Sequence, residues 1–96
     1  MTVVRMHQYK VDPERFQEFL DRRTAAIDAI REAHPGLIET RLTRLEDGTY
    51  TDVWRWDSIQ HMGAAAAQLA AFPEAPAAMS MTSDATAVNG EIIDER

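Results

Sequence analysis

Three side chains with catalytic chemistry stand at alternate positions near the start of the chain. Arg5, His7 and Tyr9 are two residues apart, so in a β-strand they share one face of the sheet. A neutral imidazole at His7 can take a phenolic proton near neutral pH, and the Arg5 guanidinium can stabilise the resulting phenolate or a developing peroxide. Two alternatives stay open: His7 as a hydrogen-bonded histidine between sheet and helices, and Arg5 paired with an acid such as Glu39 or Asp52.

Aromatic side chains supply a second pattern. Tyr50, Asp52, Trp54 and Trp56 fall on alternate positions and share one face of a predicted strand. Such a wall can hold a flat polycyclic molecule by offset stacking, although core packing or a dimer interface explains the tryptophans equally well. His61 and Met62 follow on the first turn of a predicted helix, where they can border the mouth of a pocket. The alternative for His61 is an ordinary surface position.

The candidate site therefore combines catalytic and substrate-binding residues. His7 is the predicted base and Arg5 the predicted electrostatic stabiliser, and the substrate-binding residues are Tyr9, Trp54, Trp56, His61 and Met62. The chain contains no cysteine, no glycine-rich phosphate loop and no His/carboxylate spacing typical of a metal site. We therefore predict neither a metal nor an organic cofactor.

The elements that must position these residues follow the order β-α-β-β-α-β. Alternating β-rich residues predict strands, capping and proline signals bound the helices, and an Asp-Gly pair at residues 47–48 marks a hairpin. The predicted strands cover residues 2–11, 37–45, 49–56 and 85–93, and the predicted helices cover 13–33 and 58–71, with a short helical or irregular piece up to residue 81. An Asn-Gly pair at residues 89–90 is expected to interrupt the last strand as a bulge or a turn.

This order is typical of a ferredoxin-like βαββαβ sandwich, an α+β fold with an antiparallel four-stranded sheet and both helices on one face. The uncovered face would still carry bulky side chains, which is more apolar surface than a monomer normally leaves in water. A chain of 96 residues without cysteine also has few other means of stabilising a small core. We therefore predict a homodimer joined through the helix-free faces of the two sheets.

Composition limits the classes of function. Residues 1–96 are expected to form a single domain. The formal net charge is −6, the wrong sign for neutralising phosphates, so nucleic-acid binding is not predicted. No stretch is long and apolar enough to span a bilayer, and the first residues lack the basic and apolar regions of a secretory signal. We expect a cytoplasmic protein that binds neither nucleic acid nor membrane.

Three short segments carry a resemblance to a known family. The sequences VDPERF (11–16), HPGL (34–37) and WDS (56–58), the last before an alanine-rich amphipathic helix, resemble the antibiotic biosynthesis monooxygenase family of dimeric α/β barrel proteins. The resemblance implies a homodimer with a pocket between sheet and helices in each protomer. It also implies the founding activity of that family, oxygenation of polyphenolic aromatic molecules by O2 without flavin, heme or metal.

One branch of the family is not favoured by the sequence. Its heme-degrading members place an Asn near the end of the first strand, and a Trp and an iron-ligating His on the second helix. Alignment on residues 56–58 puts His7, Ala65 and Ala75 at these positions here. Two of the three functional positions are lost, so heme degradation is disfavoured, although His61 on the first turn of the second helix could be an unrelated ligand.

The sequence leaves two classes of function open. One is a cofactor-independent monooxygenase that acts on a phenolic or quinol-type small aromatic molecule with O2. The other is a non-catalytic homodimer that binds a small molecule, and a small-molecule isomerase on the same fold is a further alternative. Convergent polar residues in an open pocket favour catalysis, whereas dry, filled surroundings of His7 favour the non-catalytic protein.

Overall fold

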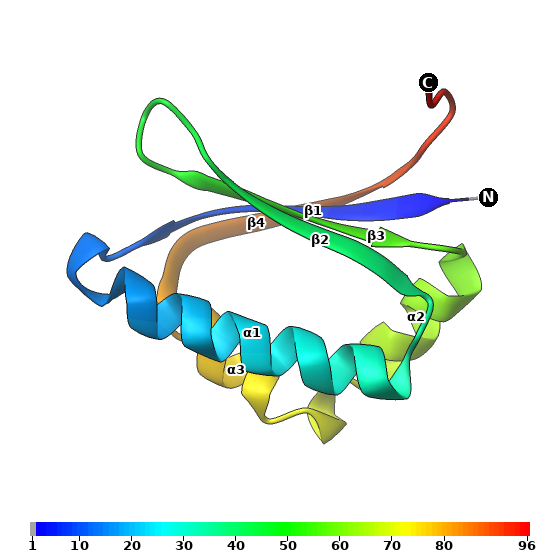
Figure 1. The fold of residues 1–96 in the computed structure, drawn as a ribbon, viewed down its shortest axis with the longest axis horizontal. Helices are drawn as coiled ribbons and strands as arrows, with labels where there is room; N and C mark the ends of the chain where they lie inside the picture. Colours follow the sequence, from blue (N-terminus) through cyan, green and yellow to red (C-terminus); the bar gives the residue numbers. More distant parts are fainter. Residues whose placement is uncertain (1) are drawn as a thin grey trace.

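The computed structural model describes residues 2–96, which form a two-layer α+β fold (Figure 1). One layer is an antiparallel four-stranded sheet with the strand order β2-β3-β1-β4, and the helices lie on one of its faces. The elements are β1 (Val3–Val11), η1 (Pro13–Arg15), α1 (Phe16–Ala33), β2 (Leu37–Arg44), β3 (Tyr50–Trp56), α2 (Ile59–Ala67), η2 (Leu69–Ala71), α3 (Glu74–Met79) and β4 (Thr82–Glu91), where η marks a 3₁₀ helix. The predicted ferredoxin-like βαββαβ fold is confirmed, with a further helix, α3, between α2 and β4.

Local signals explain where the first helix and the hairpin begin and end. The Asp12 carboxylate accepts a hydrogen bond from the Glu14 backbone N–H (3.0 Å), so it caps η1, the 3₁₀ turn that leads into α1. Between β2 and β3, Gly48 has a φ of +85°, a conformation that glycine adopts at little cost. The Asp47 carboxylate also accepts bonds from the backbone N–H (3.0 Å) and hydroxyl (2.6 Å) of Thr49. These contacts set the register of the predicted hairpin.

The second predicted helix is shorter than expected. α2 ends at Ala67, and Gln68, with φ −104° and ψ 10°, separates it from η2. The chain then turns through Pro73 into α3, which packs along α1 (Figure 1). The segment from η2 to α3 therefore closes the helix layer next to the beginning of β4.

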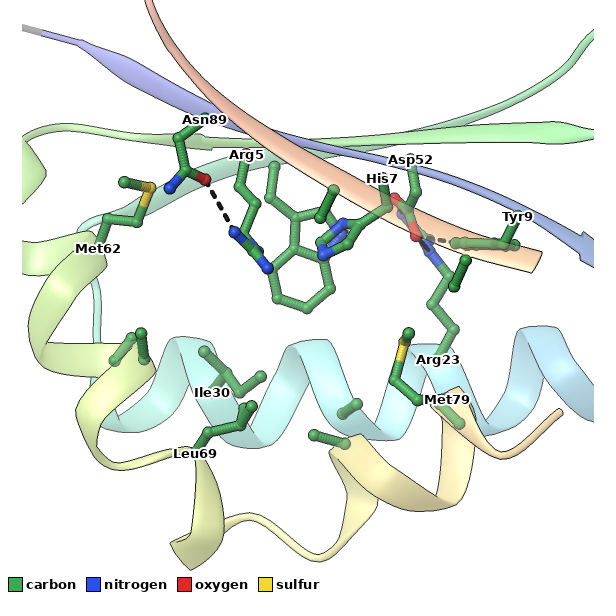
Figure 2. Close-up of a pocket in the computed structure, with 18 of the residues that line it drawn as sticks. Arg5, His7, Tyr9, Arg23, Ile30, Asp52, Met62, Leu69, Met79 and Asn89 are labelled. Atoms are coloured by element: carbon green, nitrogen blue, oxygen red, sulfur yellow. Dashed lines mark hydrogen bonds and ion pairs between the residues drawn. The ribbon is translucent and has the colours of Figure 1, made fainter. Parts of the chain in front are cut away.

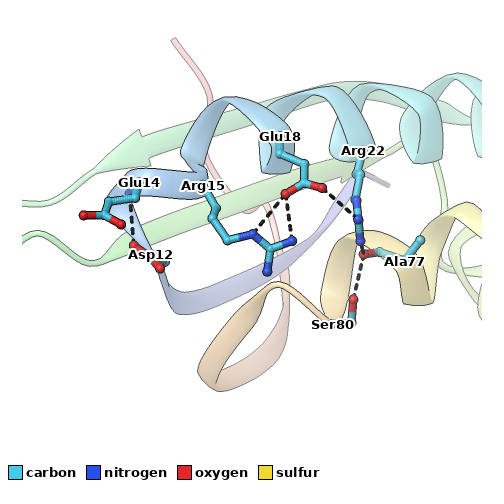
Figure 3. Close-up of polar contacts among 7 residues, drawn as sticks. All are labelled: Asp12, Glu14, Arg15, Glu18, Arg22, Ala77 and Ser80. Carbon is cyan, nitrogen blue, oxygen red and sulfur yellow. Dashed lines mark hydrogen bonds and ion pairs between the residues drawn. The ribbon is translucent and has the colours of Figure 1, made fainter.

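A cluster of hydrogen bonds attaches α3 to α1 (Figure 3). The Arg22 guanidinium donates to the Ala77 carbonyl oxygen (3.1 Å) and to Glu18 (2.9 Å), and the Ser80 hydroxyl donates to the same Ala77 oxygen (2.9 Å). Arg15 also bonds Glu18, at 2.7 Å. The Ala77 carbonyl in the last turn of α3 thus accepts one hydrogen bond from Arg22 of the distant helix α1 and one from the nearby Ser80.

The last strand differs from its prediction. β4 runs without a break through residues 89–90, where Asn89 and Gly90 pair in register with Arg5 and Val4. The irregularity lies at the other end of the strand, where Asp84 has a φ of +52° and the register shifts between the partners of Gln8 and Lys10. The expected interruption at Asn89-Gly90 is therefore wrong, because both residues pair in register with β1. The irregularity occurs near Asp84 instead, and aspartate is among the residue types that adopt the left-handed conformation most readily.

The core forms two clusters on the helix-covered face. One contains Val3, Ile27, Ile30, Leu37, Trp56, Met62 and Ala65, and the other contains Tyr9, Val11, Phe19 and Tyr50. They occupy opposite ends of the layer between α1 and the sheet. The space between the clusters is where the candidate site lies.

The opposite face of the sheet has no helix over it (Figure 1). Its apolar side chains include Met6, which is 36% exposed, and its cross-strand partner Val88, which is 59% exposed. Met6 also pairs with Val53 of its other neighbour, β3, so Val53 lies on the same helix-free face. Trp54 and Trp56 of β3 therefore lie on the face that the helices cover. Within residues 2–96, no helix has the length and apolar character needed to cross a membrane.

Candidate functional site

A cavity of about 560 Å³ lies between the sheet and the helices (Figure 2). The sheet supplies most of its polar and aromatic side chains, including Arg5, His7, Tyr9, Asp52, Trp54 and Trp56. The helices contribute mainly apolar surface, including Ile30 of α1, Met62 of α2 and Met79 of α3, and α1 adds the guanidinium of Arg23. Most polar groups therefore gather on the sheet wall of a mainly apolar chamber, an arrangement typical of small-molecule sites.

The chamber opens toward the edge strand β4. Leu69 and Met79, 48% and 43% exposed, lie on the helix side of the opening, and the exposed Ala87 and Asn89 lie on the strand side. Gly63, Ala65 and Ala66 also line the chamber, and these small residues leave volume that bulkier side chains would fill. The surroundings of His7 are thus open, unlike the filled interface that a packing histidine would occupy.

His7 projects from β1 into the chamber. Its ring lies edge-on to the Trp54 indole, with the ring centroids 6.1 Å apart and the planes at 75°. Burial lowers the pKa of His7 below its ordinary value of 6.5, the positive charge of Arg5 lowers it further, and the Asp52 carboxylate partly offsets both effects. The imidazole is consequently neutral at neutral pH and able to accept a proton.

Arg5 keeps a positive charge in the chamber. Its guanidinium donates to the Asn89 amide oxygen (2.9 Å), a neutral acceptor. The two acids that were alternative partners bind other arginines: Glu39 pairs with Arg41 (2.8 Å) and Asp52 with Arg23 (2.7 Å). Among residues 2–96, no carboxylate forms a salt bridge with Arg5.

A buried carboxylate organises the inner end of the chamber. Asp52 is only 4% exposed, and it accepts both Arg23 Nε (2.9 Å) and Arg23 Nη2 (2.7 Å). The same carboxylate accepts the Tyr9 hydroxyl (2.7 Å) and Trp54 Nε1 (3.0 Å). Burial raises the pKa of Tyr9, and the neighbouring carboxylate raises it further, so the phenol stays protonated. Tyr9 is therefore a hydrogen-bond donor here rather than an acid or base.

The other predicted binding residues differ in their placement. Trp56 (4% exposed) and Met62 (9% exposed) belong to the hydrophobic core and present part of their surface to the chamber. His61 does not line the chamber: its Nδ1 lies 2.6 Å from Asp57 Oδ1 on the exposed side of α2. The first turn of α2 thus turns Met62 inward and His61 outward, which is the surface position given above as the alternative.

Two polar residues of the site, Arg23 and Asn89, were not predicted, and Asp52 was considered only for its face of the third strand and as a partner of Arg5. A signal for Arg23 exists in the sequence, because it lies four residues after Phe19 and four before Ile27, within the apolar stripe of α1. A charged residue on such a stripe requires a buried partner. Asp52 shares the face of Trp54 on β3 and is that partner, whereas Asn89 carries no comparable signal.

The chain matches a described protein family over most of its length. The family model described as antibiotic biosynthesis monooxygenase matches residues 2–76. The chain belongs to the antibiotic biosynthesis monooxygenase family. No curated protein matches it.

Solved structures share the fold of this family member at low sequence identity. SnoaB from Streptomyces nogalater, a cofactor-independent oxygenase studied as a mutant, is 21% identical with a TM-score of 0.74, and the match covers 98% of this chain and 95% of that chain. A mutant of MhuD with two manganese protoporphyrin IX molecules per active site is 24% identical, with a TM-score of 0.67 and coverage of 98% and 97%. Rv0793 from Mycobacterium tuberculosis is 16% identical, with a TM-score of 0.69 and coverage of 99% and 98%.

The three positions compared with the heme-degrading branch all line the chamber. His7 stands on the sheet wall, and Ala65 and Ala75 stand on the helix wall. A methyl group offers no ligand atom to iron, so the helix wall lacks the histidine of that branch. The alanines instead widen the chamber.

Proposed function

We propose that the protein is a cofactor-independent monooxygenase that oxidises a phenolic or quinol-type small aromatic molecule with O2. The observation that carries the proposal is the convergence of His7 and Arg5 on one open, mainly apolar chamber. Membership of the family and the fold shared with SnoaB support it. A chamber of about 560 Å³ also lies within the range found for small-molecule sites.

In this mechanism His7 acts as a general base. It takes the hydroxyl proton of a phenol, and the phenolate passes one electron to O2. The aryloxyl radical and superoxide combine at the ring carbon para to the oxygen, and the His7 imidazolium protonates the peroxide. The base then removes the hydrogen of that carbon while the O–O bond breaks. One oxygen atom ends in the quinone and the other in water, so the substrate itself supplies every electron.

Arg5 stabilises the charges that appear during these steps. Because no carboxylate within residues 2–96 pairs with it, its guanidinium is available to the phenolate, to superoxide and to the peroxide anion. The low-dielectric apolar walls strengthen such an interaction relative to water. Trp54, Trp56 and Tyr9 bound the chamber as aromatic surfaces against which a planar substrate can stack.

The proposed assembly is a homodimer. The helix-free face carries Met6, Val53 and Val88, and a second copy of the same face would cover them. The chamber lies on the opposite side of the sheet, so each protomer would keep its own entrance.

Isotope labelling tests the reaction type. Purified protein treated with a chelator is incubated with a dihydroxynaphthalene that has a hydrogen para to one hydroxyl, under O2 enriched in the heavy oxygen isotope. The proposal predicts one labelled atom in each quinone, labelled water, and one O2 consumed per product. Quinone without label, or a requirement for added metal or flavin, would contradict this reaction. No product above the protein-free control would leave the non-catalytic binding protein as the better interpretation.

A further inference from the structure

The ion pair between Arg23 and Asp52 lies beside the proposed base and has no role in the reaction described above. Asp52 stands opposite His7 in the register of β1 and β3, and Arg23 reaches it from α1 (Figure 2). The two side chains are only 14% and 6% exposed. Burying two charges is costly, and apolar residues of similar size often stabilise a fold as well or better. Such a pair in a chamber wall therefore points to a function besides stability.

The first consequence of the pair is geometric. Asp52 Oδ1 accepts Trp54 Nε1 at 3.0 Å while both carboxylate oxygens are held by the Arg23 fork. The bidentate fork has one preferred orientation, so it fixes the carboxylate and, through it, the indole. The indole is the ring against which the His7 imidazole packs. Arg23 thus orients His7 through Asp52 and Trp54.

The second consequence is electrostatic. The charged groups that face His7 are Arg5 from its own strand, Asp52 from β3 and Arg23 from α1, with the neutral phenol of Tyr9 beside them. β4 contributes Ala87 and Asn89 to the chamber and α3 contributes Met79, none of which titrates. Arg23 cancels the carboxylate charge, so the chamber keeps the single positive charge of Arg5. An unpaired Asp52 would instead favour the imidazolium and repel a phenolate.

We propose that Arg23 and Asp52 are positioning residues of this site, which hold the Trp54 indole against His7 and balance the carboxylate charge that faces the imidazole. The inference rests on the proposed function for its catalytic meaning. Its physical content, the orientation and titration of His7, can be measured without any turnover.

The decisive experiment is a proton NMR titration of the His7 Cε1–H signal, assigned by its loss in His7→Gln. Asp52→Asn removes the carboxylate and leaves the Arg23 guanidinium charged, because arginine does not deprotonate. His7 then faces two cations, and its titration midpoint is expected at lower pH than in the wild type. In the double variant Arg23→Gln/Asp52→Asn, which buries no charge, the midpoint is expected to return toward the wild-type value.

The double variant also tests the geometry. Without the fork the indole is no longer fixed, so the ring-current shift that Trp54 imposes on the His7 signal is expected to diminish. Arg15→Gln, which breaks an exposed pair with Glu18, is the matched control. It should change neither the titration midpoint nor the ring-current shift of the His7 signal. A folded Asp52→Asn protein with the wild-type midpoint would overturn the proposal. If that variant does not fold, a wild-type ring-current shift of the His7 signal in the double variant would overturn it.

Kinetics separate this inference from the proposed function. With an active substrate, the double variant is expected to lose about 10- to 100-fold in kcat with little change in KM, as expected when a base is misplaced. Wild-type values of KM and kcat in the double variant would contradict the proposal that Arg23 and Asp52 position His7. If the wild-type protein turns over no aromatic substrate while the NMR changes occur, the proposed function fails and the positioning of His7 stands.

Discussion

At the scale of single residues, ion pairing determines the electrostatic character of the chamber. Arg23 and Asp52 neutralise each other, and Tyr9 stays a protonated donor. In the part of the chain that the structure describes, Arg5 donates to the neutral Asn89 and pairs with no carboxylate. A neutral His7 beside an unpaired guanidinium suits a reaction that turns a phenol into an anion. None of these residue types is catalytic by itself. The pairing of Arg23 with Asp52 leaves the neutral imidazole of His7 and the positive charge of Arg5 for the reaction.

The pH dependence of turnover follows from the pKa of His7. A base must be unprotonated to act, and burial together with Arg5 holds the pKa of His7 below 6.5. We expect kcat/KM to have reached its plateau at neutral pH and to fall only as the pH drops below 6.5. A pH–rate profile measured in buffers of constant ionic strength checks this. A profile still rising steeply above neutral pH would show that another group is the base.

Only part of this site could be predicted from the sequence. Alternation placed His7 with Tyr9 on one face of β1, and Trp54 with Trp56 on one face of β3, because parity within a strand determines it. Which face of each strand lines the pocket was left open, because that depends on the register and on the side that the helices cover. Arg23 was missed, because whether a charge within an apolar stripe is buried depends on a partner that only the fold brings near. His61 was expected at the pocket mouth, although neighbouring positions on a helix turn point in directions about 100° apart.

At the scale of elements, a close approach between the end of α1 and the beginning of α2 fixes the sheet against the helices. A Cβ at Gly36 would lie 2.7 Å from Asp57 Oδ1, 2.7 Å from His61 Nδ1 and 2.9 Å from His61 Cβ. The Asp57 backbone N–H also donates to the Gly36 carbonyl oxygen (2.9 Å). There is no room for a side chain at this crossing.

We therefore expect Gly36→Ala to destabilise the protein by about 1–3 kcal/mol, because the His61–Asp57 pair must move. Gly63→Ala is the matched control: its Cβ would meet nothing within 4 Å, and it lies inside α2. Alanine there should stabilise the protein by about 0.5–1 kcal/mol through helix propensity. Urea denaturation curves of both variants measure the difference. Equal effects of the two substitutions would contradict the close packing at residue 36.

The element order could be predicted because its signals are local. The Asp12 cap and the Asp-Gly hairpin act within a few residues, so β1, α1, β2 and β3 were located to within a few positions. The segment after α2 was less predictable, because α3 is only six residues long and is held by the Arg22 bond to Ala77 from α1. The bulge at Asp84 likewise depends on how β4 pairs with β1, rather than on a glycine in the sequence.

At the scale of the whole molecule, the two faces of the sheet differ in what they contact. One face carries the chamber, and the other presents Met6 and Val88 to solvent. We expect sedimentation equilibrium at micromolar concentration to give twice the chain mass of 10.8 kDa. Val88→Glu should shift the protein toward the monomer, because it would bury a carboxylate in the interface.

Ile59→Glu is the control for the dimer prediction. Ile59 is also an exposed aliphatic residue (60% exposed), but it lies on α2 in the helix layer. This substitution should leave the molecular mass unchanged. A 10.8 kDa wild-type species at all concentrations would refute the dimer, and dissociation by Ile59→Glu alone would place the interface on the helices.

The central claim is that His7 is the base of an oxygenation reaction, and the most direct test is the turnover of a dihydroxyaromatic substrate by His7→Ala and His61→Ala. His7 lines the chamber and His61 lies outside it, so the two variants remove the same chemical group from different places. We expect His7→Ala to lose at least about 10²-fold in kcat per folded molecule with its thermal stability retained, while His61→Ala keeps the wild-type rate. An unchanged rate in His7→Ala together with a lower melting temperature would show that His7 is not the base and that its role is packing.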